Sequence, residues 1–203
     1  MYYDEEYQLE TEESIDEIPA KPVKKHSELL EWIQAIVIGI VLTIIVRTFL
    51  FTAVLVEGDS MVPTLHTGDR IFAVKVYGNL NYGDIVVFKP KENPNRPYIK
   101  RVIATEGQTV DIDYYTSEVK VDGVILDEPF IKDQEITQRG DLVLPAKVPA
   151  DTVFVMGDNR NNSHDSRATE VGMVDKSTII GKAVWRMWPF GKSTNMSVDR
   201  KTR

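Results

Sequence analysis

One long apolar run, WIQAIVIGIVLTIIVRTFLF over residues 32–51, constrains this chain more than any other feature. In a helix, about 20 residues cover about 30 Å, the hydrocarbon thickness of a bilayer. The run is apolar on all faces, unlike the single apolar face of a core helix. It also begins after 31 residues and is not followed by the small residues of a cleavage site, which makes a cleaved signal peptide a poor interpretation. Arg47, near its end, can extend to the lipid headgroups. We therefore predict an uncleaved transmembrane anchor over residues 31–51.

The segment before this run carries the charge of the chain. Residues 1–31 hold ten acidic and three basic side chains, which accounts for the whole formal charge of −7. Because it has few large apolar residues, we predict a disordered tail over residues 1–30. Lys21, Lys24 and Lys25 just before the span indicate a cytoplasmic N-terminus and an extracytoplasmic body. The body is neutral, so it offers no electrostatic basis for binding nucleic acid.

Cysteine and histidine side chains are scarce in this chain, and this limits the kinds of metal site and nucleophile that it can form. The chain has no cysteine, so disulfides, a thiol nucleophile and thiolate metal sites are excluded. Its histidines, His26, His66 and His164, form no pair with ligand spacing. We expect no metal and no cofactor. A Ser-His mechanism would have to use His66 or His164.

After the span, the pattern changes to short alternating segments separated by turns. Asp122-Gly123 is a strong two-residue hairpin signal, because both positions of that turn need positive φ. We predict a mainly β fold over residues 52–203, an antiparallel sheet sandwich or partly closed barrel. The candidate strands are 53–57, 70–76, 84–89, 98–105, 108–113, 118–126, 141–146, 152–157 and 178–188.

Two short clusters could carry nucleophilic chemistry. GDSMVPTL at 58–65 places Ser60 in a tight turn close behind the span, where a serine by itself is usually turn chemistry. YIKRVIA at 98–104 reads as a strand that puts Lys100 and Arg101 on opposite faces. If Lys100 faces inward, desolvation lowers its pKa, as a general base requires. The alternative is an edge strand with both charges solvated.

A third cluster, GDNRNNSHDSR at 157–167, is unusually rich in arginine and short polar side chains. Such side chains suit a fixed hydrogen-bond network better than a solvated loop. The three clusters, in this order behind an anchor, resemble the type I signal peptidases, and the short intervening segments resemble their Gram-positive branch. These are Ser-Lys peptidases that remove signal peptides from exported proteins.

The resemblance implies a role for each matching residue. Ser60 would attack the scissile carbonyl, and Lys100 would act as its general base. Ser163 matches the serine that orients the lysine, and Asp165 and Arg167 match the pair that braces this loop. The Ser60 backbone N–H would form part of the oxyanion hole. Some family members have a serine hydroxyl where this chain has Gly58, so the second donor stays unassigned.

The resemblance also implies the partners and the place of action. Signal peptides of preproteins would be cleaved after small residues at −1 and −3, outside a cell membrane and next to the bilayer. The apolar strand before Ser60 could bind the substrate as an added strand. The expected substrate-binding residues are Val54, Leu55, Val56, Gly58 and Met61.

Two alternatives remain open from the sequence. Self-cleaving repressors of the DNA-damage response share the Ser-Lys chemistry and the β core, but they have a DNA-binding segment and no membrane span. A non-catalytic β-rich binding module on a membrane anchor is also possible, although it leaves the lysine cluster and the third cluster without a purpose.

Overall fold

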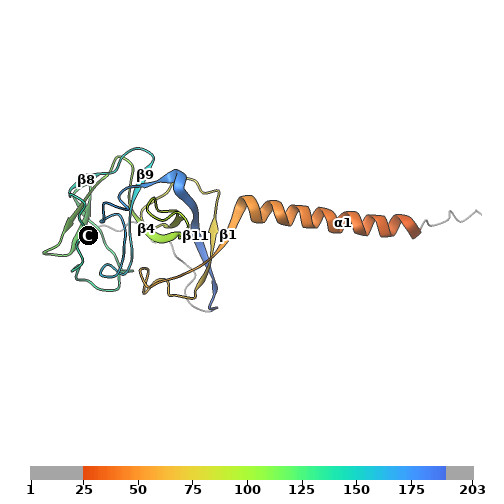
Figure 1. Ribbon diagram of the computed structural model, residues 1–203, viewed down its shortest axis with the longest axis horizontal. Helices are drawn as coiled ribbons and strands as arrows, with labels where there is room; N and C mark the ends of the chain where they lie inside the picture. The colour runs from red at the N-terminus through yellow and green to blue at the C-terminus, as the bar shows by residue number, and fades with distance from the viewer. Residues whose placement is uncertain (1–24, 191–203) are drawn as a thin grey trace, which may run out of the picture. The chain divides into compact units, whose positions relative to one another are not determined.

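A computed structural model describes residues 25–190 of the chain (Figure 1). The predicted tail over residues 1–30 falls almost wholly outside the described residues. The chain divides into two compact units, Met1–Val41 and Leu42–Arg203. The first contains most of α1 (Lys25–Ile45), and the second contains the whole β body.

Helix α1 has the length and composition of a membrane span. The apolar stretch Glu28–Leu50 has a mean hydropathy of 2.4, and none of it is buried. It includes η1 (Val46–Leu50), one turn of π-helix that follows α1. A helix that is apolar all round and uncovered by protein has the features of a membrane anchor.

The helical stretch ends slightly earlier than predicted. Strand β1 (Phe51–Leu55) begins at once after η1, so Phe51 belongs to the sheet and not to the span. The Leu50 carbonyl already accepts a hydrogen bond from the Lys75 N–H. Backbone pairing with β2 (Arg70–Val74) therefore replaces the helical hydrogen bonds from this point on.

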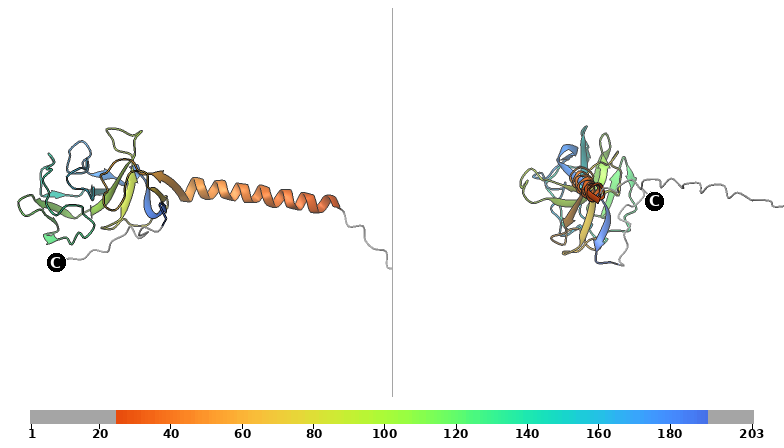
Figure 2. Two further views of the ribbon diagram at one scale, coloured as in Figure 1. Left: turned by 90° about the horizontal axis from the view of Figure 1, so that it is seen from below. Right: turned by 90° about the vertical axis from the view of Figure 1, so that its right-hand side faces the viewer.

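The main sheet is antiparallel and has seven strands in the order β1-β2-β11-β3-β4-β9-β10. It curls without closing, since β1 and β10 are its two edges (Figure 2). This confirms the predicted mainly β fold with a partly closed barrel. Its further strands are β2 (Arg70–Val74), β3 (Ile85–Phe88), β4 (Tyr98–Thr105), β9 (Thr152–Met156), β10 (Val174–Asp175) and β11 (Ile179–Trp188).

A smaller sheet in the order β7-β6-β5-β8 lies at the other end of the body from β1 and β11 (Figures 1 and 2). Asp122 and Gly123, with φ of 54° and 76°, form the predicted two-residue hairpin. The elements here are β5 (Thr109–Asp113), β6 (Glu118–Val121), β7 (Val124–Ile125) and β8 (Ala146–Lys147), and the 3₁₀ turn η2 (Lys176–Thr178) precedes β11.

The predicted strand over residues 141–146 is wrong, apart from its last residue in β8. The Asp141 carboxylate instead accepts hydrogen bonds of 2.7 Å from both the N–H and the hydroxyl of Thr169. The Leu142 N–H bonds the Arg167 carbonyl. Hydrogen bonds to Arg167 and Thr169 thus replace a strand ladder.

The buried core forms three clusters, one of which lies under the turn that carries Ser60. In it Met61 and Leu65, 1% and 0% exposed, pack with Ile71 and Ala73 of β2. Burying a side chain of this size contributes roughly 1.5–3 kcal/mol. The turn after Ser60 is therefore held down by apolar contacts, which leave its polar residues at the surface.

Candidate active site

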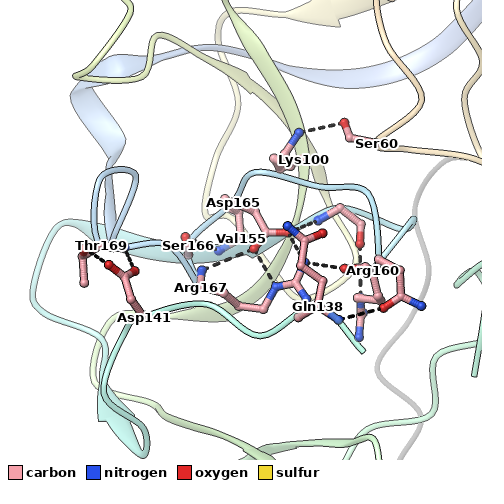
Figure 3. Close-up of polar contacts among 12 residues, drawn as sticks. Ser60, Lys100, Gln138, Asp141, Val155, Arg160, Asp165, Ser166, Arg167 and Thr169 are labelled. Carbon is pink, nitrogen blue, oxygen red and sulfur yellow. Dashed lines mark hydrogen bonds and ion pairs between the residues drawn. The ribbon is translucent and has the colours of Figure 1, made fainter. Parts of the chain in front are cut away.

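Ser60 begins the turn that connects β1 to β2. Gly58, two residues earlier, has φ of 83°, which a residue with a side chain rarely adopts. This reversal ends the strand and presents Ser60, half-buried, toward strand β4. The Ser60 Oγ accepts a hydrogen bond of 2.8 Å from the Lys100 Nζ (Figure 3).

Lys100 lies in β4, between β3 and β9 in the middle of the main sheet. Its side chain is buried, at 4% exposure, and its Nζ also donates to the Ile99 carbonyl at 3.1 Å. Burial lowers the pKa of Lys100 from 10.5 to about 8, although Asp165 and Asp158 partly oppose it. A large share of such amines is neutral near pH 8, and a neutral amine can accept a proton.

Neither face of β4 is solvated. Arg101 is 1% exposed and binds the Asp158 carboxylate through two hydrogen bonds of 2.8 and 2.7 Å. The same guanidinium stacks over the Phe130 ring at 4.0 Å. The edge-strand alternative, with both charges in water, is therefore wrong, because β4 is covered on both faces.

Asp165 and Arg167 form a buried bidentate pair in the third cluster, with distances of 2.8 and 2.9 Å (Figure 3). Arg167 also donates to the carbonyls of Gln138 and Arg160, and Asp165 accepts from the Gly157 N–H. Burial tends to raise the pKa of Asp165, but Arg167 and the Gly157 N–H keep it below its ordinary value. Both charges are thus compensated, and the loop is fixed from inside.

Ser163 is buried beside this site but does not bond the lysine. Its Oγ makes no hydrogen bond of ordinary geometry with a described residue, although it lies near enough to the Asp165 carboxylate to help lower the pKa of that group, and its side chain lies against Gly157. A Cβ on Gly157 would come within 2.3 Å of this Oγ and 2.5 Å of the Ser60 carbonyl oxygen. Position 157 therefore has to be glycine, because the loop there lies against both Ser60 and Ser163. The expected Ser163–Lys100 hydrogen bond is not formed.

Several residues of the site escaped the sequence analysis. Asn159 bonds the turn of Ser60 twice: its N–H donates to the Ser60 carbonyl and its side-chain amide to the Asp59 carbonyl, both at 3.0 Å. Arg160 forms a second buried bidentate pair, with Glu128, at 2.8 and 2.6 Å. Only the density of Asn and Arg in 157–167 pointed to such a network.

The expected substrate-binding residues fall into two groups. Leu55, 52% exposed, and half-buried Val54 lie on the edge strand β1, and Gly58 is open. Val56 and Met61, only 2% and 1% exposed, belong to the core below. They support the strand and present little surface to a ligand.

Neither described histidine bonds Ser60. His164 is 44% exposed in its side chain and faces Glu170 and Glu92 at 3.4 and 3.9 Å. His66 is half-buried, and its Nδ1 has no hydrogen-bond partner among the described residues. Within residues 25–190, no group of three or more metal-ligating side chains is close enough to hold an ion.

A serine hydroxyl that is hydrogen-bonded to a buried lysine amine is an arrangement suited to nucleophilic catalysis. Residues 29–188 match the family described as signal peptidase, peptidase S26, and the chain belongs to this family. It is therefore a serine endopeptidase of the signal peptidase class, which decides against the repressor and binding-module alternatives.

Known relatives carry the same description along nearly their whole length. Signal peptidase I of Bacillus licheniformis is 38% identical over 85% of this chain and 95% of its own. Signal peptidase I T of Bacillus subtilis (strain 168) is 38% identical over 90% of this chain and 97% of its own. A crystal structure of a signal peptidase I from Enterococcus faecalis V583 covers 52% of this chain and 97% of its own, with 27% identity and a TM-score of 0.43.

Proposed function

We propose that the protein removes N-terminal signal peptides from exported preproteins at the outer surface of a cell membrane, with Ser60 as nucleophile and Lys100 as general base. The single observation that carries this proposal is the 2.8 Å hydrogen bond between Lys100 Nζ and Ser60 Oγ, made by a buried amine. The family membership supports the substrate class.

The proposed reaction has two halves. Neutral Lys100 takes the Ser60 proton as Oγ attacks the scissile carbonyl, and the resulting ammonium then protonates the leaving amine. The product is an acyl-enzyme with the signal peptide on Ser60. Lys100 next takes a proton from water as the water attacks the ester, and it returns this proton to the Ser60 Oγ when the signal peptide leaves. The Ser60 N–H stabilises the oxyanion in both halves.

The edge strand β1 is the proposed substrate platform. No strand of the described residues pairs with its outer edge, so an extended cleavage site can pair with it by backbone hydrogen bonds. Ser60 follows the end of β1 closely, which brings the paired backbone to the nucleophile. We propose that Val54, Leu55 and Gly58 contact the residues before the cleavage site, with Val56 and Met61 beneath, and that small side chains are favoured at −1 and −3.

The test is cleavage of a preprotein with an Ala-X-Ala site by the full-length protein in detergent. We expect Ser60→Ala and Lys100→Met each to reduce the rate by at least about a thousandfold, as loss of a nucleophile or base does in other serine peptidases. Lys89→Met, at an exposed lysine, is the matched control and is expected to keep full activity.

Substantial residual activity in Lys100→Met would exclude the proposed mechanism. The variant with both His66→Ala and His164→Ala is expected to keep most activity, because neither side chain bonds Ser60. A strong loss in this double variant would indicate a histidine base instead.

A further inference from the structure

The peptide bond between Asp59 and Ser60 carries the N–H that we expect to donate to the oxyanion in the proposed mechanism. This peptide bond is trans. In a planar trans peptide, the C=O and the N–H point in opposite directions. Whatever holds the Asp59 carbonyl therefore also sets the direction of the Ser60 N–H.

Asn159 holds this carbonyl from the opposite loop. Its Nδ2 donates to the Asp59 oxygen at 3.0 Å, and its own N–H donates to the Ser60 carbonyl at 3.0 Å. One residue thus fixes the peptide planes on both sides of the Ser60 Cα. Within residues 25–190, the Asp59 carbonyl also accepts a hydrogen bond from the Val62 N–H of the local turn, at a longer 3.2 Å.

Asn159 itself is firmly anchored. It is 4% exposed and follows Asp158, whose carboxylate is tied to Arg101 and also accepts a 2.5 Å bond from the Thr64 hydroxyl. Thr64 belongs to the same turn as Ser60. The loop and the turn are therefore joined at two points, and the amide of Asn159 has little freedom to turn away.

We propose that Asn159 is a positioning residue that directs and polarises the Ser60 N–H toward the oxyanion. A hydrogen bond to the carbonyl end of a peptide makes its N–H a stronger donor. The effect matters in this chain because Gly58 has no hydroxyl to contribute, so stabilisation of the oxyanion depends heavily on this one amide. The inference rests on the proposed function of Ser60.

The test compares Asn159→Ala and Asn159→Asp with Asn161→Ala in the full-length protein, using the same preprotein assay. Asn161 is the matched control, because its side chain bonds residues 135–138 and not the Ser60 turn. We expect kcat to fall about 10- to 100-fold in both Asn159 variants, less than the loss of an oxyanion donor itself, because Val62 still holds the carbonyl. KM is expected to stay within about twofold, and Asn161→Ala to keep wild-type kcat.

A second readout separates oxyanion stabilisation from a merely structural role. Ser60 adds to the carbonyl of a peptide aldehyde with the substrate sequence and forms a tetrahedral adduct, whose oxygen lies where the oxyanion would form. In the Ser60→Ala background, the intact substrate peptide forms no such adduct. We expect aldehyde affinity to fall in parallel with kcat. Substrate-peptide affinity, measured in a Ser60→Ala background, is expected to be unchanged by Asn159→Ala.

Three results would overturn the inference: wild-type kcat in both Asn159 variants, equal loss of aldehyde and substrate affinity, or a loss of activity that matches a loss of folded protein by thermal unfolding. Asn159→Asp keeps the shape of the side chain, so this variant can be used for the test if the alanine variant does not fold. If Ser60→Ala is fully active, the proposed function fails. If Ser60→Ala is inactive while Asn159→Ala retains wild-type kcat, only the present inference fails.

Discussion

At the residue scale, burial and nearby carboxylates have opposite effects on the pKa of Lys100. Desolvation disfavours its ammonium form more strongly than Asp165 and Asp158 stabilise it, and the pKa falls to about 8. The two carboxylates are themselves engaged by Arg167 and Arg101, which limits their pull on the lysine. The paired arginines therefore help to keep this amine available as a base.

The pH dependence of cleavage follows from this value. As the proposed general base, Lys100 must be neutral to accept a proton, so kcat/KM is expected to increase with pH and to level off above a midpoint near 8. The measurement is the initial rate at low preprotein concentration from pH 6 to pH 10. A midpoint near 6.5, the ordinary range of histidine, would contradict Lys100 as the base.

Lys100 also carries a cost in stability. Its folded pKa lies below the unfolded value of 10.5, so the unfolded chain binds more protons between pH 8 and 10.5. The penalty is complete below about pH 8 and disappears as the pH rises toward 10.5. It amounts to the order of 3 kcal/mol.

We therefore expect Lys100→Met to be inactive but more stable than the wild type at pH 7, with the advantage shrinking toward pH 10.5. Thermal unfolding of both proteins in detergent across this pH range measures it. A variant that is less stable at pH 7 would show that the bonds of Lys100 to Ser60 and Ile99 outweigh the desolvation.

At the scale of elements, β4 connects two networks. Adjacent residues Lys100 and Arg101 point into opposite faces of one interior strand, one toward the nucleophile and the other toward the 157–167 loop. Three bidentate arginine–carboxylate pairs then fix that loop and its surroundings. The loop is rigid because its charges are paired inside the protein.

Arg101→Met is expected to destabilise the protein by about 3–5 kcal/mol, because Asp158 would be left buried without its cation. Chemical unfolding of the full-length protein in detergent measures this, with Arg96→Met at an exposed arginine as the control. Adding Asp158→Asn to the Arg101 variant is expected to restore part of the loss. An effect of Arg101→Met no larger than that of Arg96→Met would contradict this account.

At the scale of the whole molecule, most of the apolar helix and the β body belong to separate compact units. The apolar stretch Glu28–Leu50 has no buried residue, as suits a membrane anchor. The body has its own core of buried side chains in three clusters. We propose a single-pass protein with its N-terminus in the cytoplasm and its peptidase body outside.

Protease added to the outside of intact cells is expected to digest the body and to spare residues 1–25. Antibodies against each terminus on a blot of treated cells distinguish the products. Protection of the body together with loss of the N-terminal tail would show the opposite orientation, and with it the weakness of the lysine signal before the span.

The sequence by itself determined the features that depend on local pattern. These are the apolar helix from its length and composition, the β body from alternation, and the Asp122-Gly123 turn from its need for positive φ. The motifs around Ser60 and Lys100 predicted these two residues as the proposed nucleophile and base. Periodicity and turn chemistry act over a few residues, so they can be read directly from the chain.

Only the tertiary structure decided how distant residues meet. No local pattern could show that Asn159 hydrogen-bonds the turn of Ser60, or that Arg101 is buried with Asp158. Nor could it show that residues 141–145 lie outside the sheet, where Asp141 and Leu142 bond Thr169 and Arg167. The tertiary structure also left Ser163 without the expected bond to Lys100. The physical reason is that a buried polar group takes whichever partner the packing of remote segments brings within reach.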